Sequence, residues 1–240
     1  MQARRKNSVN TRGALPASEQ FLGDFPLFAD LKRNEIKRLA RGAVSYELPR
    51  GRVLFHRGEA CAALHLVVSG QVKLSVQTAR GDEKVIELVG AGGSLGEVAL
   101  LMKQPYIMTA EVIADAGFVE LGRDAVLEQL AHNVNFLRCI LGEVCRRLNQ
   151  RTRDLENCLL LNGTQRVAGF LLSQAPANGS TGTLTTITLP TKKSIIASRL
   201  NLTHEHFSRI LREIQTAGLV EVRGRQIRLL DVARLRNFPN

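Results

Sequence analysis

The sequence predicts an α+β protein in which a β-barrel is followed by one long helix and then by a small domain of short helices and a β-hairpin. Three observations predict this order. Short runs of Val, Leu and Ile alternate with glycine-containing turns, a heptad pattern of apolar residues follows, and two short amphipathic segments precede a hairpin pattern near the end. We therefore divide the chain into residues 1–20, 21–132, 133–161 and 162–240.

The barrel prediction rests on the segment between residues 44 and 121. Runs such as Leu64–Val68, Val72–Val76 and Val85–Val89 have the length and composition of strands, with glycine turns between them. Short strands at this spacing are typical of an all-β sandwich or barrel. Within Val72–Val76 the apolar residues alternate with Lys73 and Ser75, so we expect one face of that strand to meet solvent. Residues 21–132 are therefore expected to hold the barrel and its flanking short helices, and the polar, basic residues 1–20 to form a mobile tail.

A seam of mostly apolar residues predicts a helix from Asn133 to Leu161. The positions step by three and four residues along the chain. They are Val134, Leu137, Leu141, Val144, Leu148, Arg151, Leu155 and Cys158. A helix of about 40 Å, at 1.5 Å per residue, is too long for one barrel to cover. We expect it to pair with a second copy in a parallel homodimer, the alternative being a core helix within one monomer, and Arg151 to set the register of the seam.

The end of the chain predicts a winged helix-turn-helix. A helix over Lys192–Leu200 is followed by the break Asn201–Thr203 and a second helix over His204–Ala217. Asparagine tolerates the left-handed backbone that a tight turn needs, and Thr203 can cap the second helix. A hairpin with a basic tip follows at 220–229, which completes the pattern.

The charge distribution also supports a winged helix-turn-helix in the last third of the chain. Residues 162–240 carry eleven Lys and Arg against four Asp and Glu, within a chain of net charge +11. A basic winged domain indicates binding to double-stranded DNA. Side chains at the start of the second helix would read base edges in the major groove. These are His204, Glu205, Ser208 and Arg209. Other residues would contact the phosphate backbone. These are Lys192, Lys193, Arg199, Thr203, Arg212, Arg223 and Arg225.

The stretch Leu202–Leu211 resembles the recognition helix of the Crp/Fnr superfamily of bacterial transcription regulators. Segments 51–59, 70–74 and 96–101 are similar to that family's cyclic-nucleotide-binding-like barrel, a double-stranded β-helix. The Glu-x-x-Ser-Arg pattern at 205–209 resembles the Dnr/Nnr-type, nitric-oxide-responsive branch with Fnr-like specificity. The resemblance covers about residues 21–231. It implies an effector-gated homodimer, an activator or a repressor, that binds a near-palindromic TTGAT-type site and works with RNA polymerase. The cytoplasm is the expected location, because neither a secretory signal nor a membrane span is evident.

The same resemblance guides what the barrel would bind. The family holds cyclic nucleotides with a Gly-Glu pair, present as Gly96 and Glu97, and a later arginine, which residues 106–109 lack. Cyclic AMP is therefore not expected, since its phosphate would lose a charge-assisted partner. No cysteine precedes Cys61, which argues against an iron–sulfur cluster. The Dnr-like branch implies haem. Candidate ligands are His56, His65 and His132, and the expected effector pocket combines Gly96 and Glu97 with Leu137 and Leu141.

Other functions remain open at this point. The barrel would be a plain scaffold in a constitutive DNA-binding protein, or the regulator would sense thiol chemistry through Cys61, Cys139 or Cys145. A cupin-like metal enzyme is a remote alternative, because His56 and His65 have only Glu59 nearby and no catalytic triad is evident. We expect that the protein is not an enzyme and that it has no metal site. No apolar run approaches the roughly 18 residues of a membrane span, so no membrane partner is expected.

Overall fold

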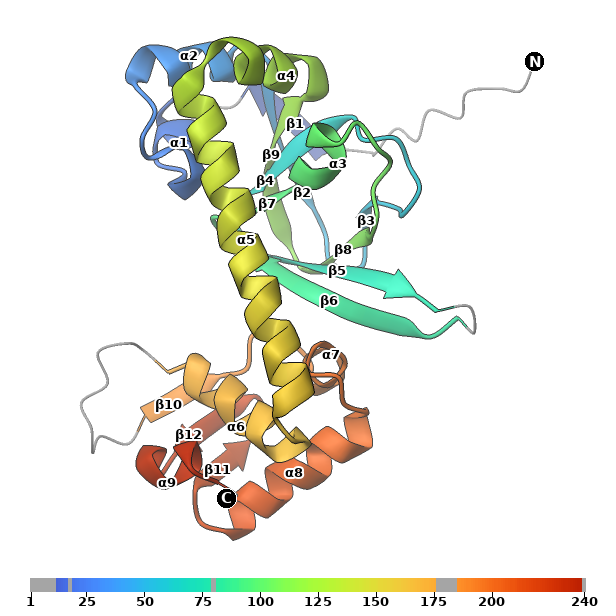
Figure 1. Ribbon diagram of the computed structural model, residues 1–240, viewed down its shortest axis with the longest axis vertical. Helices are drawn as coiled ribbons and strands as arrows, with labels where there is room; N and C mark the ends of the chain where they lie inside the picture. The colour runs from blue at the N-terminus through green and yellow to red at the C-terminus, as the bar shows by residue number, and fades with distance from the viewer. Residues whose placement is uncertain (1–11, 17–18, 79–80, 176–184, 239–240) are drawn as a thin grey trace. The chain divides into compact units, whose positions relative to one another are not determined.

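A computed structural model describes residues 12–16, 19–78, 81–175 and 185–238. The chain forms two compact units, residues 1–148 and 149–240. Figure 1 shows the elements of each unit, with the long helix α5 (Val134–Leu160) running from the first into the second. The sequence placed this helix at Asn133–Leu161, so its bounds are predicted to within one residue.

Two antiparallel sheets form the N-terminal unit, and among the described residues they have the strand orders β1-β2-β9-β4-β7 and β3-β8-β5-β6. This sandwich confirms the predicted fold class. The strands are Arg12–Pro16 (β1), Ala43–Leu48 (β2), Val53–Phe55 (β3), Ala63–Val67 (β4), Gln71–Gln77 (β5), Glu83–Gly90 (β6), Ser94–Leu95 (β7), Thr109–Ala114 (β8) and Ala116–Gly122 (β9). The helices before α5 are Glu19–Gly23 (α1), the 3₁₀ turn Pro26–Phe28 (η1), Arg33–Ala40 (α2), Glu97–Leu101 (α3) and Arg123–His132 (α4).

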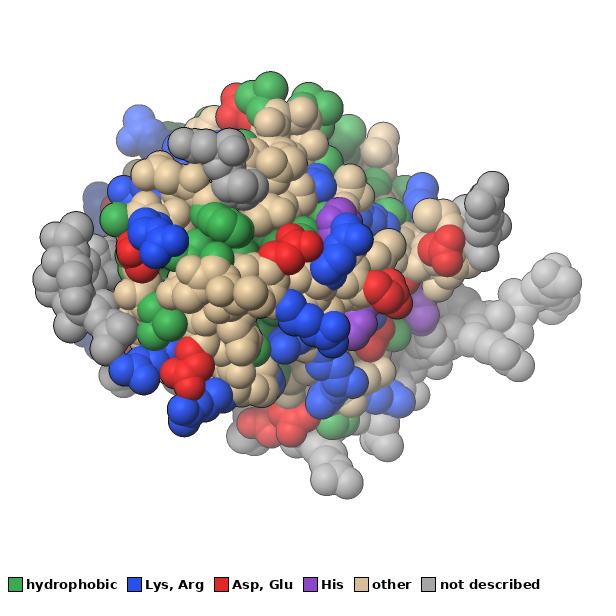
Figure 2. Space-filling view, turned by 90° about the horizontal axis from the view of Figure 1, so that it is seen from below, with side chains coloured by type: hydrophobic (Ala, Val, Ile, Leu, Met, Phe, Trp, Pro, Cys, Tyr) green, Lys and Arg blue, Asp and Glu red, His purple; other side chains and the backbone are tan. Residues whose placement is uncertain are grey.

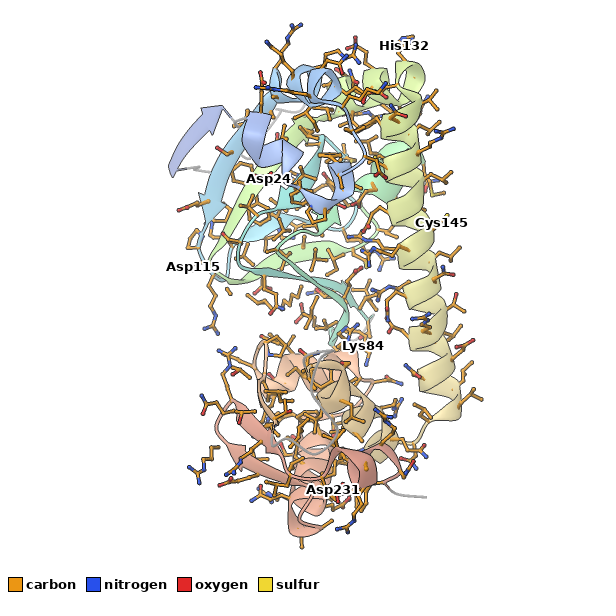
Figure 3. The ribbon with its side chains drawn as sticks, turned by 90° about the vertical axis from the view of Figure 1, so that its left-hand side faces the viewer. Asp24, Lys84, Asp115, His132, Cys145 and Asp231 are labelled. Carbon is orange, nitrogen blue, oxygen red and sulfur yellow. The ribbon has the colours of Figure 1, made fainter. Side chains whose placement is uncertain are left out.

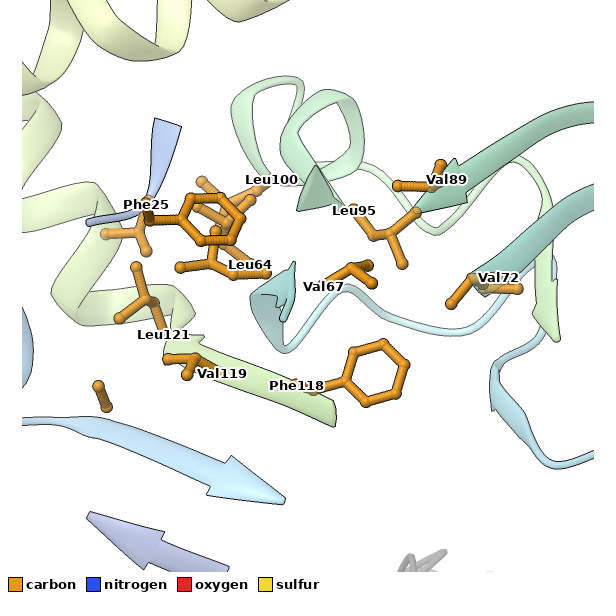
Figure 4. Close-up of a cluster of buried hydrophobic side chains, with 14 of the residues drawn as sticks. Phe25, Leu64, Val67, Val72, Val89, Leu95, Leu100, Phe118, Val119 and Leu121 are labelled. Carbon is orange, nitrogen blue, oxygen red and sulfur yellow. The ribbon is translucent and has the colours of Figure 1, made fainter. Parts of the chain in front are cut away.

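The core of this unit lies between the sheets and under the helices. Figure 4 shows part of it, where Phe118 and Val119 of β9 lie near Leu64 and Val67 of β4. On α5, Phe136 and Ile140 are buried and belong to the same core. Burying side chains of this size stabilises the fold by about 1.5–3 kcal/mol each. The barrel thus holds one face of the first half of α5.

The opposite face of α5 is exposed. Within residues 134–160 the exposed large apolar side chains form a stripe. They are Val134, Leu137, Leu141, Leu148, Leu155, Leu159 and Leu160. Of the other predicted seam positions, Val144 and Arg151 are half-buried and Cys158 is exposed. The predicted seam is therefore a row of residues that the chain itself mostly leaves uncovered.

Two local expectations are wrong. Residues 12–16 of the expected tail form β1, which pairs with β2, because the edge of β2 offers unpaired backbone groups. Residues 1–11 and 17–18 lie outside the described residues. Strand β5 has no solvent-facing side at Lys73 and Ser75, both of which are buried. Glu83 accepts from both side chains at 2.7 Å, and Glu111 lies 3.0 Å from the Lys73 ammonium. Buried charges persist when they are paired in this way.

In the C-terminal unit, helices cover a three-stranded sheet with the order β10-β12-β11 among the described residues. The strands are Thr185–Thr188 (β10), Val220–Arg223 (β11) and Gln226–Leu229 (β12), and the helices after α5 are Gly163–Ser173 (α6), Lys193–Arg199 (α7), His204–Thr216 (α8) and Val232–Arg236 (α9). A reciprocal capping box starts α6: Asn162 accepts from the Gln165 N–H at 2.9 Å, and Gln165 accepts from the Asn162 N–H at 3.0 Å.

Candidate nucleic-acid interface

The turn between α7 and α8 has the geometry expected of a helix-turn-helix. Asn201 adopts φ 57°, the left-handed conformation that asparagine tolerates. The Leu202 N–H then donates to the Ala197 carbonyl at 2.9 Å, which closes the end of α7. The Thr203 hydroxyl accepts from the His206 N–H at 3.2 Å and caps α8. The chain therefore starts α8 at a defined residue and direction.

Helix α8 has one buried face and one exposed face. Phe207, Ile210, Leu211 and Ile214 are at most 3% exposed and join the core of the C-terminal unit. Three of the predicted base-reading residues, His204, Glu205 and Arg209, are exposed, and Ser208 is half-buried. This division follows from the helical spacing of the apolar residues. The first turns of α8 thus present polar side chains outward on a rigidly packed helix.

The charged side chains on this face, Glu205 and Arg209, interact mainly with groups of the same helix and its cap. The Glu205 backbone N–H and the Thr203 hydroxyl, both at the start of α8, lower the pKa of the Glu205 carboxyl, so it is ionised at neutral pH. The Arg209 side chain is 69% exposed and has its Nε 3.8 Å from Glu213. A pair this long and exposed holds a side chain weakly. The Arg209 guanidinium is therefore available to a partner.

The predicted wing is present as β11 and β12. Arg223 pairs with Gln226 across a two-residue turn, in which Gly224 has φ 61°. Both Nε and Nη2 of Arg225 donate to the Leu189 carbonyl, at 3.1 and 2.7 Å. Arg223 is paired with Glu221 at 2.6 Å. Arg225 thus fixes the wing against the chain after β10. The N–H groups of Arg225 that do not contact Leu189 are left for a ligand.

The remaining predicted backbone contacts divide in two. Lys192, Thr203 and Arg212 are exposed and Lys193 is half-buried, while the Arg199 guanidinium lies 3.8 Å from Asp154 on α5. Figure 2 shows Lys and Arg side chains gathered on one face of the C-terminal unit, with fewer acidic ones among them. Arg228 of β12 is also exposed and was not among the predicted contacts. Its signal was available, because it alternates with the buried Ile227 and Leu229.

The expected effector pocket is assembled only in part. Gly96 and Glu97 line a small cavity in the barrel, together with Arg147 of α5. Arg147 Nη1 donates to Glu97 at 3.0 Å, and Nη2 donates to the Ser94 carbonyl. Burial raises the pKa of the Glu97 carboxyl, although Arg147 opposes that rise. Leu137 and Leu141 do not line this cavity and lie on the exposed stripe of α5 instead.

The three candidate haem ligands do not fit that role in this structure. His56 and His132 are exposed, and Figure 3 shows His132 at the surface beside the start of α5. His65 is buried, with Nδ1 3.0 Å from the Tyr46 hydroxyl and Nε2 3.4 Å from that of Tyr106. The neighbouring cavity measures about 50 Å³, well below the roughly 300–1,000 Å³ of small-molecule sites. A haem macrocycle has neither a free ligand nor the space that it needs there.

The buried imidazole of His65 gives a pH-dependent prediction. Burial lowers the pKa of His65 to about 4, below its ordinary value of 6.5. Above pH 6.5 both the folded and unfolded states are neutral at this residue. Between pH 6.5 and 4 only the unfolded state takes up a proton, so the free energy of unfolding falls by about 3 kcal/mol. Urea unfolding of wild type and His65→Gln over this range checks the effect, which parallel pH profiles would contradict.

The three predicted sensor thiols differ in their surroundings. Cys61 is buried and points its sulfur at the carbonyls of Ala63 and Gly96, at 3.6 and 3.8 Å. Burial raises the pKa of the half-buried Cys139 thiol, which makes it less reactive. Cys145 is exposed on the side of α5 away from the sheets (Figure 3). Among the described residues, no cluster of three His, Cys, Asp or Glu side chains is placed to hold a metal ion.

The described part of the chain contains no helix that is both long and apolar enough to span a bilayer. Two family models match the chain: residues 46–133 match the cyclic nucleotide-binding domain, and residues 165–238 match the Crp-like helix-turn-helix domain.

Several known proteins are similar over most of the chain. The CRP-like cAMP-activated global transcriptional regulator of Mycobacterium tuberculosis is 23% identical over 90% of this chain and 97% of its own. The transcriptional activator protein FnrA of Stutzerimonas stutzeri is 26% identical over 77% and 75%. A putative cyclic nucleotide binding protein from Ruegeria pomeroyi has a TM-score of 0.61 and 28% identity over 92% and 96%. FixK2 from Bradyrhizobium japonicum, at TM-score 0.70 and 23% identity over 81% and 96%, shares the fold. The chain belongs to the Crp/Fnr family of DNA-binding transcription regulators.

Proposed function

We infer that the protein is a homodimer that binds a near-palindromic DNA site with α8 in the major groove of each half-site. One observation carries this proposal: Glu205 and Arg209 lie one turn apart on the exposed face of a helix whose other face is buried. Glutamate accepts from the cytosine amino group and arginine bridges O6 and N7 of guanine. The resemblance of 205–209 to the Dnr/Nnr-type pattern favours a TTGAT-type half-site.

The dimer would form through the exposed stripe of α5. Its apolar side chains have the heptad spacing of a coiled-coil seam, and Leu141 and Leu155 are 57% and 59% exposed. In a two-fold dimer the same stripe of each subunit would pack against its copy in the other subunit. Such a dimer would place two recognition helices about 34 Å apart, one turn of DNA.

The effector gate is proposed at Glu97 and Arg147. Arg147 lies on the same helix as the dimer stripe, and it closes the cavity that Glu97 lines. A ligand that replaces Arg147 at Glu97 would release one contact of α5 with the barrel and shift a pre-existing equilibrium. Haem and cyclic AMP are not part of this proposal. The described part of the barrel lacks the free ligand and the space that haem needs, and residues 106–109 lack the later arginine expected for cyclic AMP.

Removing the Arg209 guanidinium tests base reading. Arg209→Ala is expected to lose about 1–3 kcal/mol of preference for the TTGAT-type site over a duplex with the matching G·C pair changed. Fluorescence anisotropy at one salt concentration measures both affinities. Arg234→Ala is the matched control, because Arg234 is an exposed arginine on α9 of the same unit. Equal discrimination by wild type and Arg209→Ala would overturn the assignment of α8.

Removing the Lys192 ammonium tests backbone contact. Lys192 is exposed at the start of α7, so Lys192→Ala is expected to weaken binding similarly for specific and random duplexes. The slope of log K against log salt should become less steep by about one unit, since one fewer counterion is released. Titrations at four salt concentrations measure that slope. An unchanged slope would show that Lys192 does not meet a phosphate.

A further inference from the structure

A cavity of about 440 Å³ lies within the C-terminal unit, away from the exposed face of α8. It is lined by the last turns of α5, by α6 and by the end of α7 with the turn that follows. Its volume falls within the range of small-molecule sites, which is roughly 300–1,000 Å³. Of its lining residues, only Arg199 is among the predicted phosphate contacts.

Two arginines line this cavity with donors that the protein does not use. The Nε atoms of Arg166 on α6 and Arg199 on α7 are buried, and neither has a hydrogen-bond partner among the described groups. A buried N–H without a partner costs about 1–3 kcal/mol or more when it is charged. Because both side chains line the same cavity, a small movement of either guanidinium would bring its buried Nε–H to an acceptor on a bound ligand.

The charge and shape of the cavity favour an anion. Its one carboxylate, Asp154, already lies 3.0 Å from Arg151 and 3.8 Å from Arg199, so the group as a whole stays positive. Guanidinium groups match the planar oxygens of carboxylates and phosphates with paired donors. Phe170, only 8% exposed, adds an apolar wall that suits the carbon atoms of an organic ligand.

Cys158 and Asn201 connect the cavity to the helix-turn-helix. The Cys158 sulfur accepts from Arg166 Nη1 at 3.6 Å and from Asn201 Nδ2 at 3.4 Å. Asn201 is the left-handed residue that sets the turn before α8. A ligand at Arg166 would therefore compete with the Cys158 sulfur, which also accepts from the residue that aims the recognition helix.

We propose that this cavity binds a small organic or inorganic oxyanion, of the carboxylate or phosphate class, through Arg166 and Arg199. Its occupation changes DNA affinity by acting on the α7–α8 turn, a consequence that rests on the proposed function. The binding step itself does not depend on it.

Protection of Cys158 in the full-length protein tests the proposal. The cysteines are alkylated with iodoacetamide in the presence of inorganic phosphate, citrate or sodium chloride at equal ionic strength. Mass spectrometry measures the rate at each cysteine. Phosphate or citrate at ten times its dissociation constant is expected to slow alkylation of Cys158 by about tenfold, by mass action. Cys145, which is exposed outside the cavity, serves as the internal control and should keep its rate. If neither anion slows Cys158 more than Cys145, the proposal is wrong.

A substitution separates binding at Arg166 from general charge effects. Arg166→Gln is expected to raise the anion concentration for half-protection about tenfold or more, because a charged hydrogen bond is lost. Arg153→Gln removes the same charge from an exposed position on α5 outside the cavity and should leave that concentration unchanged. Equal protection of wild type and Arg166→Gln would overturn the site. If Arg166→Gln does not fold, Arg166→Lys, which keeps the charge but loses the Nε donor, takes its place.

DNA binding is then measured with and without the protecting anion. A change in affinity at constant ionic strength supports action through the turn, and an unchanged affinity contradicts it. Cys158 protection without any DNA binding would overturn the proposed function and leave the anion site standing.

Discussion

Replacing Leu141 and Leu155 together by glutamate will convert the protein to a monomer and weaken its binding to a palindromic site by at least ~100-fold. Both side chains are more than half exposed on the apolar stripe of α5. In the proposed dimer they face their copies, so four carboxylates would meet in an apolar seam, where unpaired charge is costly. The linked binding of two recognition helices would be lost with the dimer.

Sedimentation equilibrium measures the mass, and anisotropy measures affinity for the full palindrome and for a single half-site. Half-site affinity should not change, since α8 is untouched. The control is the pair Met102→Glu and Ile107→Glu, which adds the same charge at apolar side chains 59% and 51% exposed but off α5. A dimer that survives the Leu141 and Leu155 changes would place the subunit contact elsewhere.

Replacing Arg147 by alanine will lower the free energy of unfolding of the N-terminal unit by about 3–5 kcal/mol. The Glu97 side chain is 2% exposed, and Arg147 is its charged partner at 3.0 Å. Without Arg147 the carboxylate stays buried with no countercharge beside it, and its pKa rises further. Glu143 at 3.2 Å and the Ser94 carbonyl would also lose the guanidinium.

Urea denaturation of the full-length chain measures this loss, with tyrosine fluorescence as the probe. Arg146→Ala is a closely matched control, because Arg146 is the next residue and its side chain is 64% exposed in its pair with Glu143. An exposed pair of this kind contributes about 1 kcal/mol or less. The double variant Glu97→Gln with Arg147→Met should recover much of the loss, because it removes both buried charges. Equal destabilisation by the two single arginine variants would contradict the central role of Arg147.

Regular spacing explains what the sequence alone could predict. The heptad steps of α5 and the buried stripe of α8 come from helical periodicity, and both helices appear within one residue of their expected bounds. The left-handed turn at Asn201 and the cap at Thr203 were also predictable, because few residue types suit these positions. Exposure of Glu205 and Arg209 followed from the same periodicity.

Contacts between distant residues were beyond that reasoning. Glu97 and Arg147 are fifty residues apart, and nothing in their local pattern joins them. Lys73 predicted a solvent-facing side of its strand, but Glu83 and Glu111 from two neighbouring strands pair with it there. Arg199 has the charge of a phosphate contact, yet Asp154 on α5 lies beside its guanidinium. The ion-pair partners of long side chains come from segments that only folding brings together, so local sequence patterns do not predict them.

The backbone at Asn201 restricts which variants a selection experiment would return. A φ of 57° suits Gly, Asn and, less well, Asp, whereas a β-branched side chain would be strained there. Glycine would keep the turn but remove the amide that reaches Cys158. In a saturation library at position 201, selected so that growth requires DNA binding by the protein, these residues should therefore dominate. Asparagine should outcompete glycine wherever the contact with Cys158 adds fitness.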